Sequence, residues 1–312
     1  MEPLVSIITP SFNSSKYLDA YFQSIKNQDY SNYEIIFIND GSTDETEDIV
    51  LKYKKYFENQ GKRFMYLKQE NGGQAKAMNY GFPYIQGKYF IWPDSDDELY
   101  SNNISEKVKF MESNPDISLG ISGADYVDEK GNILDHLERK CMSDDDFFKD
   151  LLISNNVVFC PGIYIMRTDA FFKWIPNGQI NESRIGQNYQ ILLPIAYHEK
   201  WGYIHKTLYK YILHENSHSN KNNDKYEYEI IRFQKQEKTL YELLESICDK
   251  DDLQYYSNLV YSHFHKFYLR LANQYGKKDD LKKYYKEISC VNENGFKEKI
   301  YYIMGLLGIR KR

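Results

Sequence analysis

The sequence contains few cysteines, and they are widely scattered. Only four occur among 312 residues, at positions 141, 160, 248 and 290, and no two form a Cys-x-x-Cys pair. Such pairs are typical of zinc sites, and small domains built on disulfides need a much higher density of cysteine. We therefore expect neither a zinc site nor a disulfide framework, and a reduced, cytoplasmic protein is the simplest interpretation.

Long apolar runs and a strong net charge are also missing. No stretch reaches the roughly 18 apolar residues that a membrane-spanning helix needs. The apolar run Leu4–Ile8 is short and follows the acidic Glu2, so we expect no signal peptide. The formal net charge is only −5, which argues against a general nucleic-acid binder.

The chain nevertheless has the composition of a folded protein. Hydrophobic residues make up 42% and aromatic residues 16% of it, which excludes a disordered chain. A length of 312 residues fits one large domain and a smaller one.

Short apolar runs alternate with helical patterns through the first hundred residues. This alternation predicts an α/β fold with a doubly wound, mostly parallel sheet that helices cover on both faces. Ligands of such sheets bind beyond the carboxyl ends of the strands. The predicted strands are Leu4–Thr9, Glu34–Ile38, Arg63–Leu67 and Lys88–Trp92, and the polar segments Thr9–Asn13, Asn39–Ser42 and Asp94–Asp97 follow three of them.

The pattern changes from Ile117 onward. A hairpin is expected around Gly131, a helix from a cap at Ser143 to Ile153, and a helix over Ile185–Tyr197 that Pro194 interrupts. Further predicted strands are Val157–Phe159, Ile163–Met166, Tyr203–Ile204 and Leu208–Leu213. After the polar, Asn-rich segment 216–224 the chain reads as helical, so we place a boundary near residue 222, giving domains 1–221 and 222–312. Two apolar stripes at helical spacing support this, one at Leu240, Leu243, Leu244 and Ile247 and the other at Tyr256, Val260, Phe264, Phe267 and Leu271.

Three carboxylates directly follow the fourth predicted strand. Asp94 and Asp96 are two residues apart, so they face the same way on extended backbone, and Asp97 follows. Close like charges resist ionising together, and a divalent cation with a preference for oxygen ligands removes that cost. Because Mg²⁺ and Mn²⁺ often complete their shells with phosphate oxygens, the segment indicates a nucleotide-diphosphate site. The alternative is a turn in which Asp and Ser cap the following helix.

Two other strand ends carry candidate binding residues. Asp40 can accept a hydrogen bond from an N–H of a base such as uracil, Gly41 lets backbone come close, and Ser42 follows. Thr9, Pro10 and Asn13 either form a wall against that base or belong to an ordinary turn. Capped turns use the same residue types, so this alternative stays open for both segments.

A glycine-rich segment opens the third predicted helix. The segment Asn71-Gly72-Gly73-Gln74-Ala75-Lys76 contains small residues, so phosphate oxygens could bind near Gly73, with Lys76 as the counter-charge. The segment matches no P-loop, and Lys76 as a solvated surface residue is the alternative.

Taken together, these motifs resemble family 2 glycosyltransferases of the GT-A fold. They occur in the order of that family, cover about residues 3–100 and are specific jointly rather than singly; a weaker likeness follows at Tyr211–Ser217. The matching segments are Val5–Asn13, Asn39–Asp44, Asn71–Gly73 with Asn79, and Asp94–Asp97.

The resemblance implies roles for the matching residues. Thr9, Pro10 and Asp40 would hold a uracil-type base, with Asn13, Gly41, Ser42, Gly73, Lys76 and Ser95 contributing to the nucleotide site. Asp94 would lie near the ribose and the metal, and Asp96 would ligate a divalent ion, Mn²⁺ or Mg²⁺, on the diphosphate. His214 falls where such enzymes place a residue near the diphosphate or metal; a surface histidine at a strand end is the alternative. Residues 1–100 would then form a donor half and 101–221 an acceptor half.

The implied activity is metal-dependent, inverting transfer of a sugar from a UDP-sugar to a glycan or lipid-linked glycan acceptor, in surface polysaccharide biosynthesis. Many relatives carry Glu-Asp at the acceptor-side helix, where the Asp is the base. Here Gln187 and Asn188 stand at the corresponding place, and neither amide accepts a proton at neutral pH. Three explanations stay open: the correspondence is shifted, another carboxylate such as Glu182 or Asp97 serves, or the amides orient the acceptor.

Two rival functions and one further partner complete the expectations. A nucleotidyltransferase also pairs such a sheet with metal carboxylates, and a non-catalytic nucleotide-binding scaffold fits the missing carboxylate. The apolar run Ile300–Ile309 before Arg310-Lys311-Arg312 reads either as an amphipathic contact with the inner face of a membrane or as a docked terminal helix. The sequence leaves open whether the protein forms oligomers.

Overall fold

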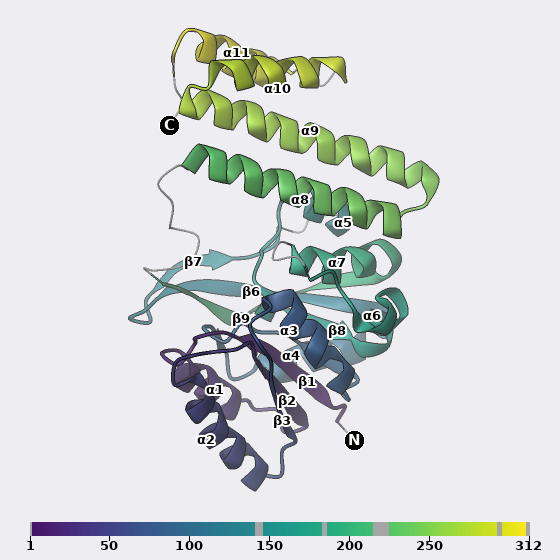
Figure 1. The fold of residues 1–312 in the computed structure, drawn as a ribbon. Coiled ribbons are helices and arrows are strands. Elements are labelled where there is room, and N and C mark those ends of the chain that lie inside the picture. Colours follow the sequence, from purple (N-terminus) through teal and green to yellow (C-terminus); the bar gives the residue numbers. More distant parts are fainter. Residues whose placement is uncertain (1, 141–145, 183–185, 215–224, 292–294, 310–312) are drawn as a thin grey trace. The chain divides into compact units, whose positions relative to one another are not determined.

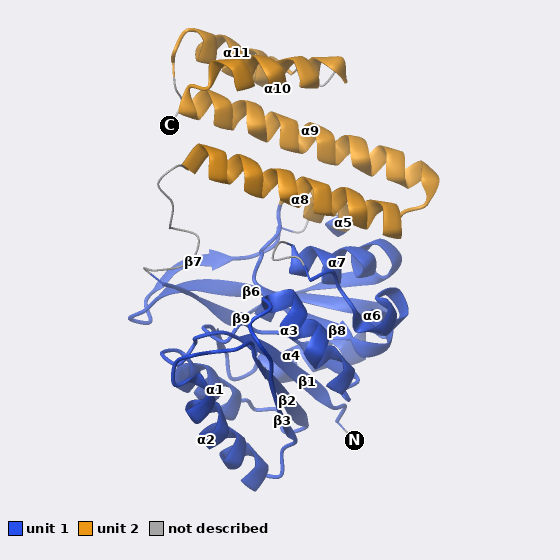
Figure 2. Cartoon of the chain, in the orientation of Figure 1, with its two compact units in different colours: residues 1–147, 156–217 blue, residues 148–155, 218–312 orange. Residues whose placement is uncertain are grey.

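The structure is a computed structural model that describes residues 2–140, 146–182, 186–214, 225–291 and 295–309. The chain divides into two compact units, shown in different colours in Figure 2. Unit 1 comprises residues 1–147 and 156–217, and unit 2 comprises residues 148–155 and 218–312. The expected cap at Ser143 lies outside the described residues.

Four parallel strands form the N-terminal half of the sheet in unit 1, in the order β3-β2-β1-β4. Figure 1 labels β1, β2 and β3 among them. Every residue of β1 and β2 is buried, as expected for strands covered on both faces. The elements are β1 (Val5–Ser11), α1 (Leu18–Lys26), β2 (Tyr33–Asn39), α2 (Thr46–Asn59), β3 (Phe64–Lys68), α3 (Gln74–Gly81) and β4 (Tyr89–Ile91).

The sheet continues beyond β4 in the order β8-β6-β9-β5, with β7 paired to β6. This half is mixed: β8 is antiparallel to both β4 and β6, whereas β9 runs parallel to β6. The strands are β5 (Glu98–Leu99), β6 (Ile117–Asp128), β7 (Ile133–Leu137), β8 (Tyr164–Arg167) and β9 (Lys200–Leu213). The α/β prediction is confirmed, and the parallel pairing is concentrated in the N-terminal strands.

Three further helices belong to the described part of unit 1. They are α4 (Asn103–Ser113), α6 (Thr168–Trp174) and α7 (Gln187–His198), with short 3₁₀ turns at Phe82–Tyr84, Pro161–Ile163 and Pro176–Gly178. Helix α5 (Phe147–Leu152) belongs to unit 2 except for its first residue. Helix α7 runs through Pro194 rather than ending at it.

Two strand predictions were wrong. Val157–Phe159 forms no strand, because Asn156 before it has a positive φ of 50° and the carbonyl of Val158 accepts from the Tyr164 hydroxyl instead of a neighbouring strand. The expected pair of strands at 203–213 is one strand, β9. The register of β9 against β6 shifts between Ser122 and Ala124, so β9 continues through the polar residues between the two predicted strands.

The described part of unit 2 is helical, with α8 (Lys225–Ile247), α9 (Lys250–Tyr275), α10 (Lys278–Cys290) and α11 (Phe296–Leu306). Its core contains residues of the two predicted apolar stripes. Leu240 and Leu244 of α8 and Val260, Phe264 and Leu271 of α9 are all at most 4% exposed. Within the described ranges, no helix has the length and hydrophobicity that crossing a bilayer requires.

Candidate functional site

The turns after β1 and β2 are tied to each other. The strands pair in parallel with Ser11 opposite Asn39, so both end at one edge of the sheet. The Asn13 side chain, on a residue with φ of 51°, accepts from the backbone N–H of Thr43 at 2.8 Å. The Asn13 N–H in turn donates to Ser42 Oγ at 2.9 Å. Asn13 and Ser42 therefore hold the crevice edge in shape.

Thr9 and Pro10 lie inside β1 and are buried. The Thr9 hydroxyl forms its hydrogen bond with the Tyr21 hydroxyl, so it is already used within the core. These two residues can form the floor of a crevice. Phe12, two residues beyond Pro10, is 46% exposed, an unusual position for a large aromatic side chain.

Asp40 is the anchor of the glycine-rich segment. Its carboxylate is buried and accepts from the backbone N–H groups of Gly72 at 2.9 Å and Gly73 at 2.8 Å, and from the Gln69 amide at 2.6 Å. An ionised carboxylate offers about four acceptor sites, so one is left. Gly41 has a φ of 75°, and a Cβ there would lie 2.6 Å from the backbone nitrogen of Asn71, so only glycine fits.

The same segment starts α3. Gly73 has a φ of 91° and stands immediately before the helix, whose first residue is Gln74. Lys76 is exposed, and its aliphatic stem lies where a side chain on Gly72 would be. Its ammonium group is therefore free to face a ligand at the surface.

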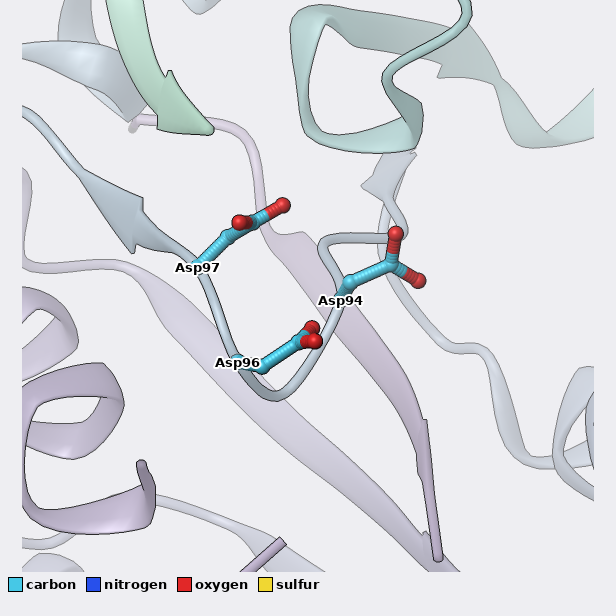
Figure 3. Close-up of side chains that lie close together, drawn as sticks. All are labelled: Asp94, Asp96 and Asp97. Carbon is cyan, nitrogen blue, oxygen red and sulfur yellow. The ribbon is translucent and has the colours of Figure 1, made fainter. Parts of the chain in front are cut away.

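The three acidic residues after β4 form a cluster (Figure 3). Each offers one carboxylate oxygen, and these oxygens lie within 4.8 Å of one another. Figure 3 shows all three on one turn that leads into β5. Ser95, between them, is buried and shares a hydrogen bond of 2.9 Å with Ser14, which fixes the turn against the segment after β1.

Burial separates the roles of the three carboxylates. The Asp96 side chain is 45% exposed, whereas Asp97 is only 2% exposed. Asp97 accepts from the Tyr209 hydroxyl at 2.9 Å and from the Ile212 N–H at 2.8 Å. Burial, followed by the charges of Asp94 and Asp96, raises the pKa of Asp97 well above its ordinary value. Its contacts make Asp97 an anchor between the acidic turn and β9.

Asp94 lies between these extremes. Burial and the neighbouring charge of Asp96 raise the pKa of Asp94 to about 7, while a hydrogen bond from the Gln74 amide, 3.0 Å long, opposes the rise. Its backbone N–H donates to the Tyr209 hydroxyl at 3.2 Å. A nearby cation would favour the ionised form of this carboxyl and so would lower its raised pKa.

His214 faces the acidic turn from the end of β9. Its side chain is only 9% exposed, and its ring lies against Tyr17 with centroids 4.1 Å apart. Within the described part of the chain, the Nε2 atom is buried without a hydrogen-bond partner, and it lies 3.9 Å from Asp96 Oδ2, too far for a hydrogen bond. Carboxylate oxygens beside an unpartnered imidazole nitrogen are a donor set that suits Mn²⁺ and, less well, Mg²⁺.

The predicted acceptor-side residues, Gln187 and Asn188, are connected to the acidic turn by contacts with Gln74 and Trp92. Helix α7 begins after Gly186, which has a φ of 78°, with Gln187 and Asn188 as its first residues. The Gln187 amide donates to Gln74 Oε1 at 2.6 Å, and Gln74 in turn contacts Asp94. The Asn188 carbonyl lies 3.5 Å from the Trp92 indole nitrogen.

The other carboxylate considered for the acceptor side, Glu182, is exposed. Among the described contacts, none joins it to the acidic turn.

Three residues of this site were missed by the sequence analysis: Phe12, Gln74 and Glu129. Phe12 was detectable as an aromatic side chain in a polar turn. Gln74 had no local signal, because it contacts Asp94 and Gln187, which are distant in the sequence. The same holds for Glu129, whose Oε1 lies 3.0 Å from His214 Nδ1.

The sheet, parallel over its N-terminal strands and mixed beyond them, carries its carboxylates past the ends of the parallel strands. The sequence model of the family described as "Glycosyl transferase family 2" matches residues 6–174, more than half of the chain. The chain belongs to this family, which confirms the resemblance stated above.

Curated relatives agree with this assignment. An uncharacterized glycosyltransferase of Rickettsia prowazekii is 40% identical over 134 residues, which is 42% of this chain and 40% of that protein. TuaG of Bacillus subtilis, a glycosyltransferase named for teichuronic acid biosynthesis, is 30% identical over 179 residues, which is 56% of this chain and 67% of that protein. The chain thus matches two fifths or less of the length of the rickettsial relatives.

Solved structures share the fold. Residues 1–349 of TarS from S. aureus, in complex with UDP-GlcNAc, align with a TM-score of 0.64 at 15% identity, covering 98% of this chain and 88% of that one. The mannosyltransferase PcManGT of Pyrobaculum calidifontis, in complex with GDP-Man and Mn²⁺, aligns with a TM-score of 0.56 at 14% identity, covering 99% and 87%.

Proposed function

We propose that the protein is a metal-dependent, inverting glycosyltransferase that moves a sugar from a UDP-sugar to a glycan or lipid-linked glycan acceptor. The observation that carries the proposal is the convergence of Asp94, Asp96 and the unpartnered Nε2 of His214 at the end of β4. That point adjoins the strand ends where Asp40 and Asn13 lie.

Asp96, Asp94 and His214 would hold the divalent ion. When bound, such an ion stabilises the charge that builds on the leaving diphosphate. Asp96 is the exposed carboxylate and so the first to meet an incoming ion, while Asp94 and His214 are already held in place by Gln74 and Tyr17. Lys76 at the start of α3 supplies a second positive charge for phosphate oxygens.

The nucleotide base would lie against the ends of β1 and β2. The remaining acceptor site of Asp40 suits the N3–H of uracil, since Gly72, Gly73 and Gln69 occupy the other three. The exposed ring of Phe12 can stack on the base, and buried Thr9 and Pro10 form the floor beneath it. The UDP-GlcNAc bound to TarS supports a UDP-sugar, whereas the GDP-Man of PcManGT keeps a guanine donor as the competing outcome.

The acceptor would approach the start of α7. Gln187 and Asn188 can donate to and accept from sugar hydroxyls but cannot remove a proton at neutral pH. We propose that they orient the acceptor hydroxyl for a direct attack on the anomeric carbon. Asp97 is only 2% exposed and each of its carboxylate oxygens already accepts a hydrogen bond within the fold, so we do not assign it as the base. Glu182 shows no described contact with the acidic turn.

Two incubations separate this function from its rivals. In the first, purified protein is incubated with a panel of UDP-sugars, and with GDP-mannose, in the presence of Mn²⁺, and release of free nucleoside diphosphate is measured. Release from one donor supports the transferase, and binding of a nucleotide-sugar without release supports a scaffold subunit. In the second, the protein is given a nucleoside triphosphate and a sugar phosphate, and release of pyrophosphate supports a nucleotidyltransferase. The likeness to TuaG favours a surface polysaccharide as the acceptor.

We further propose that α11 places the protein at an anionic membrane surface. Phe296, Ile300, Ile303 and Leu307 recur at helical spacing and are 80%, 39%, 55% and 70% exposed. Lys297 and Lys299 lie in the same helix, and the sequence continues with Arg310-Lys311-Arg312. Exposed apolar side chains beside cations suit the boundary between acyl chains and anionic headgroups.

Sedimentation with vesicles tests this contact. The protein should sediment with vesicles that contain phosphatidylglycerol and not with pure phosphatidylcholine, and Phe296→Ser with Ile303→Ser should abolish sedimentation. The membrane proposal is wrong if the parent protein stays in solution with both kinds of vesicle. It is also wrong if the parent forms dimers that the double variant breaks, because this face would then bind a second copy of the chain.

A further inference from the structure

Glu129 lies beside His214 in the structure, although 85 residues separate them in the sequence. Strands β6 and β9 are parallel neighbours, and their register places Asp128 opposite Leu213. The residue that follows each of these, Glu129 and His214, therefore emerges at the same edge of the sheet. Glu129 Oε1 and His214 Nδ1 are 3.0 Å apart, which is hydrogen-bond distance.

The turn that carries Glu129 is held by its own hydrogen bonds. Asp128 Oδ1 accepts from the backbone N–H groups of Lys130 at 2.9 Å and Asn132 at 2.8 Å. Gly131 completes the turn with a φ of 85° and donates to the Asp128 carbonyl at 2.9 Å. The backbone beneath Glu129 is thus fixed, although its side chain is 53% exposed.

The contact between Glu129 and His214 decides which imidazole nitrogen carries the proton. A carboxylate only accepts, so Nδ1 must donate and hold the hydrogen in the neutral ring. Nε2 then keeps a free lone pair, and it is this atom that is buried, unpartnered and 3.9 Å from Asp96 Oδ2. The ring cannot easily turn away, because it lies against Tyr17. Glu129, His214 and Asp96 together line a cavity of about 460 Å³ in unit 1.

We infer that Glu129 is a positioning residue for the metal site: its carboxylate fixes the tautomer and orientation of His214 so that Nε2 presents a lone pair to the divalent ion beside Asp96. Metal-bound histidines usually donate their second N–H to a carboxylate or carbonyl, and loss of that partner typically weakens metal binding by 10- to 100-fold. The inference rests on the proposed function, because it takes His214 as a ligand of the ion.

The test compares Mn²⁺ binding, measured by isothermal titration calorimetry in the presence of UDP, among four variants. Glu129→Ala should weaken Mn²⁺ binding by about 10-fold or more. Glu129→Gln, which can still accept from Nδ1 but has no charge, should lose less. His214→Ala tests the proposed ligand itself. Asp135→Asn removes a carboxylate from the same hairpin, away from His214, and should bind like the parent.

A second readout needs neither metal nor activity. In ¹⁵N spectra of metal-free protein, the His214 signals, identified by their loss in His214→Ala, should report the Nδ1–H tautomer in the parent. They should shift toward the Nε2–H tautomer in Glu129→Ala and remain in place in Asp135→Asn. If Glu129→Ala fails to fold, Glu129→Leu, which is similar in size and has no atom that can accept from Nδ1, carries the same test.

The outcomes separate the two proposals. If His214→Ala weakens Mn²⁺ binding while both Glu129 variants bind within twofold of the parent and keep its tautomer, Glu129 has no positioning role and the metal site stands. If His214→Ala itself binds Mn²⁺ like the parent, His214 is not a ligand, and both the inference and that part of the proposed function are wrong.

Discussion

The two sides of the candidate site differ in charge. The donor rim, which we define as Asn13, Asp40, Asp94 and Asp96, carries carboxylates held by backbone N–H groups and neighbouring side chains. The acceptor rim, defined as Gln187 and Asn188, carries neutral amides at the start of a helix. Charge is thus concentrated where a diphosphate and its cation would bind, and is missing where a proton must leave the acceptor. Under the proposed function, these contacts preorganise the donor site, whereas neither described amide of the acceptor rim can act as the base.

The largest expected effect is on the charged rim. Asp96→Ala removes the exposed carboxylate of the acidic turn, so Mn²⁺-dependent UDP binding should be lost, a fall of about 100-fold in affinity. Calorimetry with UDP and Mn²⁺ measures it, with Asp135→Asn as the control of equal charge change. A variant that binds UDP and Mn²⁺ as tightly as the parent would remove Asp96 from the metal site.

Asp40→Asn should have the next largest effect. In this variant an NH₂ group replaces one accepting oxygen, so a donor faces a backbone N–H of Gly72 or Gly73 and one hydrogen bond is lost. We therefore expect the free energy of unfolding to fall by roughly 1–3 kcal/mol. UDP affinity should fall about 10-fold through the lost base contact. Denaturant titration and calorimetry measure the two effects, and Asp48→Asn, exposed on α2, is the matched control. Unchanged stability would contradict the anchoring role.

On the neutral rim, Asn188→Ala should lower acceptor-dependent release of UDP by about 10-fold and leave the Kd for UDP unchanged. The isosteric Asn188→Asp should be at least as active as the parent, because it adds a carboxylate without changing shape. Steady-state kinetics with both variants sharpen the comparison between the rims. If Asn188→Ala turns over like the parent, the amides have no part in holding the acceptor.

The last prediction concerns the pH dependence of stability and a buried lysine of α4, Lys107. Lys107 is fully buried and donates to the Gly162 carbonyl at 2.6 Å, and burial lowers its pKa from 10.5 to about 7. Above pH 7 the unfolded chain holds a proton that the folded chain has released, so stability rises with pH. Between pH 7 and 9 we expect a gain of ~2 kcal/mol in the free energy of unfolding.

Lys107→Met should flatten this rise, and urea titrations at several pH values measure it. A parent protein whose stability is level or falls over this range, with no difference from Lys107→Met, would show that the ammonium group stays charged when buried.

Much of the donor rim could be predicted from the sequence, because its information is local. Apolar runs that stop at polar residues located the ends of β1, β2 and β4, and the rule for ligands of parallel sheets brought Asp40 and Asp96 to the same edge. The exact strand ends moved by a residue or two. The helical nature of unit 2 followed in the same way from the stripes around Leu240 and Phe264.

What escaped the sequence depends on pairing between distant segments. The antiparallel insertion of β8 between β4 and β6 leaves no local pattern, and Val157–Phe159 has the composition of a strand but no neighbour to pair with. The contacts of Gln74 with Gln187 and of Glu129 with His214 depend on the register of elements about 85 to 113 residues apart. The domain boundary near residue 222 and the roles of the site residues stay predictions.

The most direct test of the account is the affinity of the parent protein for UDP, measured by calorimetry with Mn²⁺ and again with EDTA. A cation held by Asp94, Asp96 and His214 should couple to the diphosphate, so UDP should bind about tenfold or more tightly with Mn²⁺. Equal affinity under both conditions would contradict the claim that these residues gather a metal ion for the leaving group.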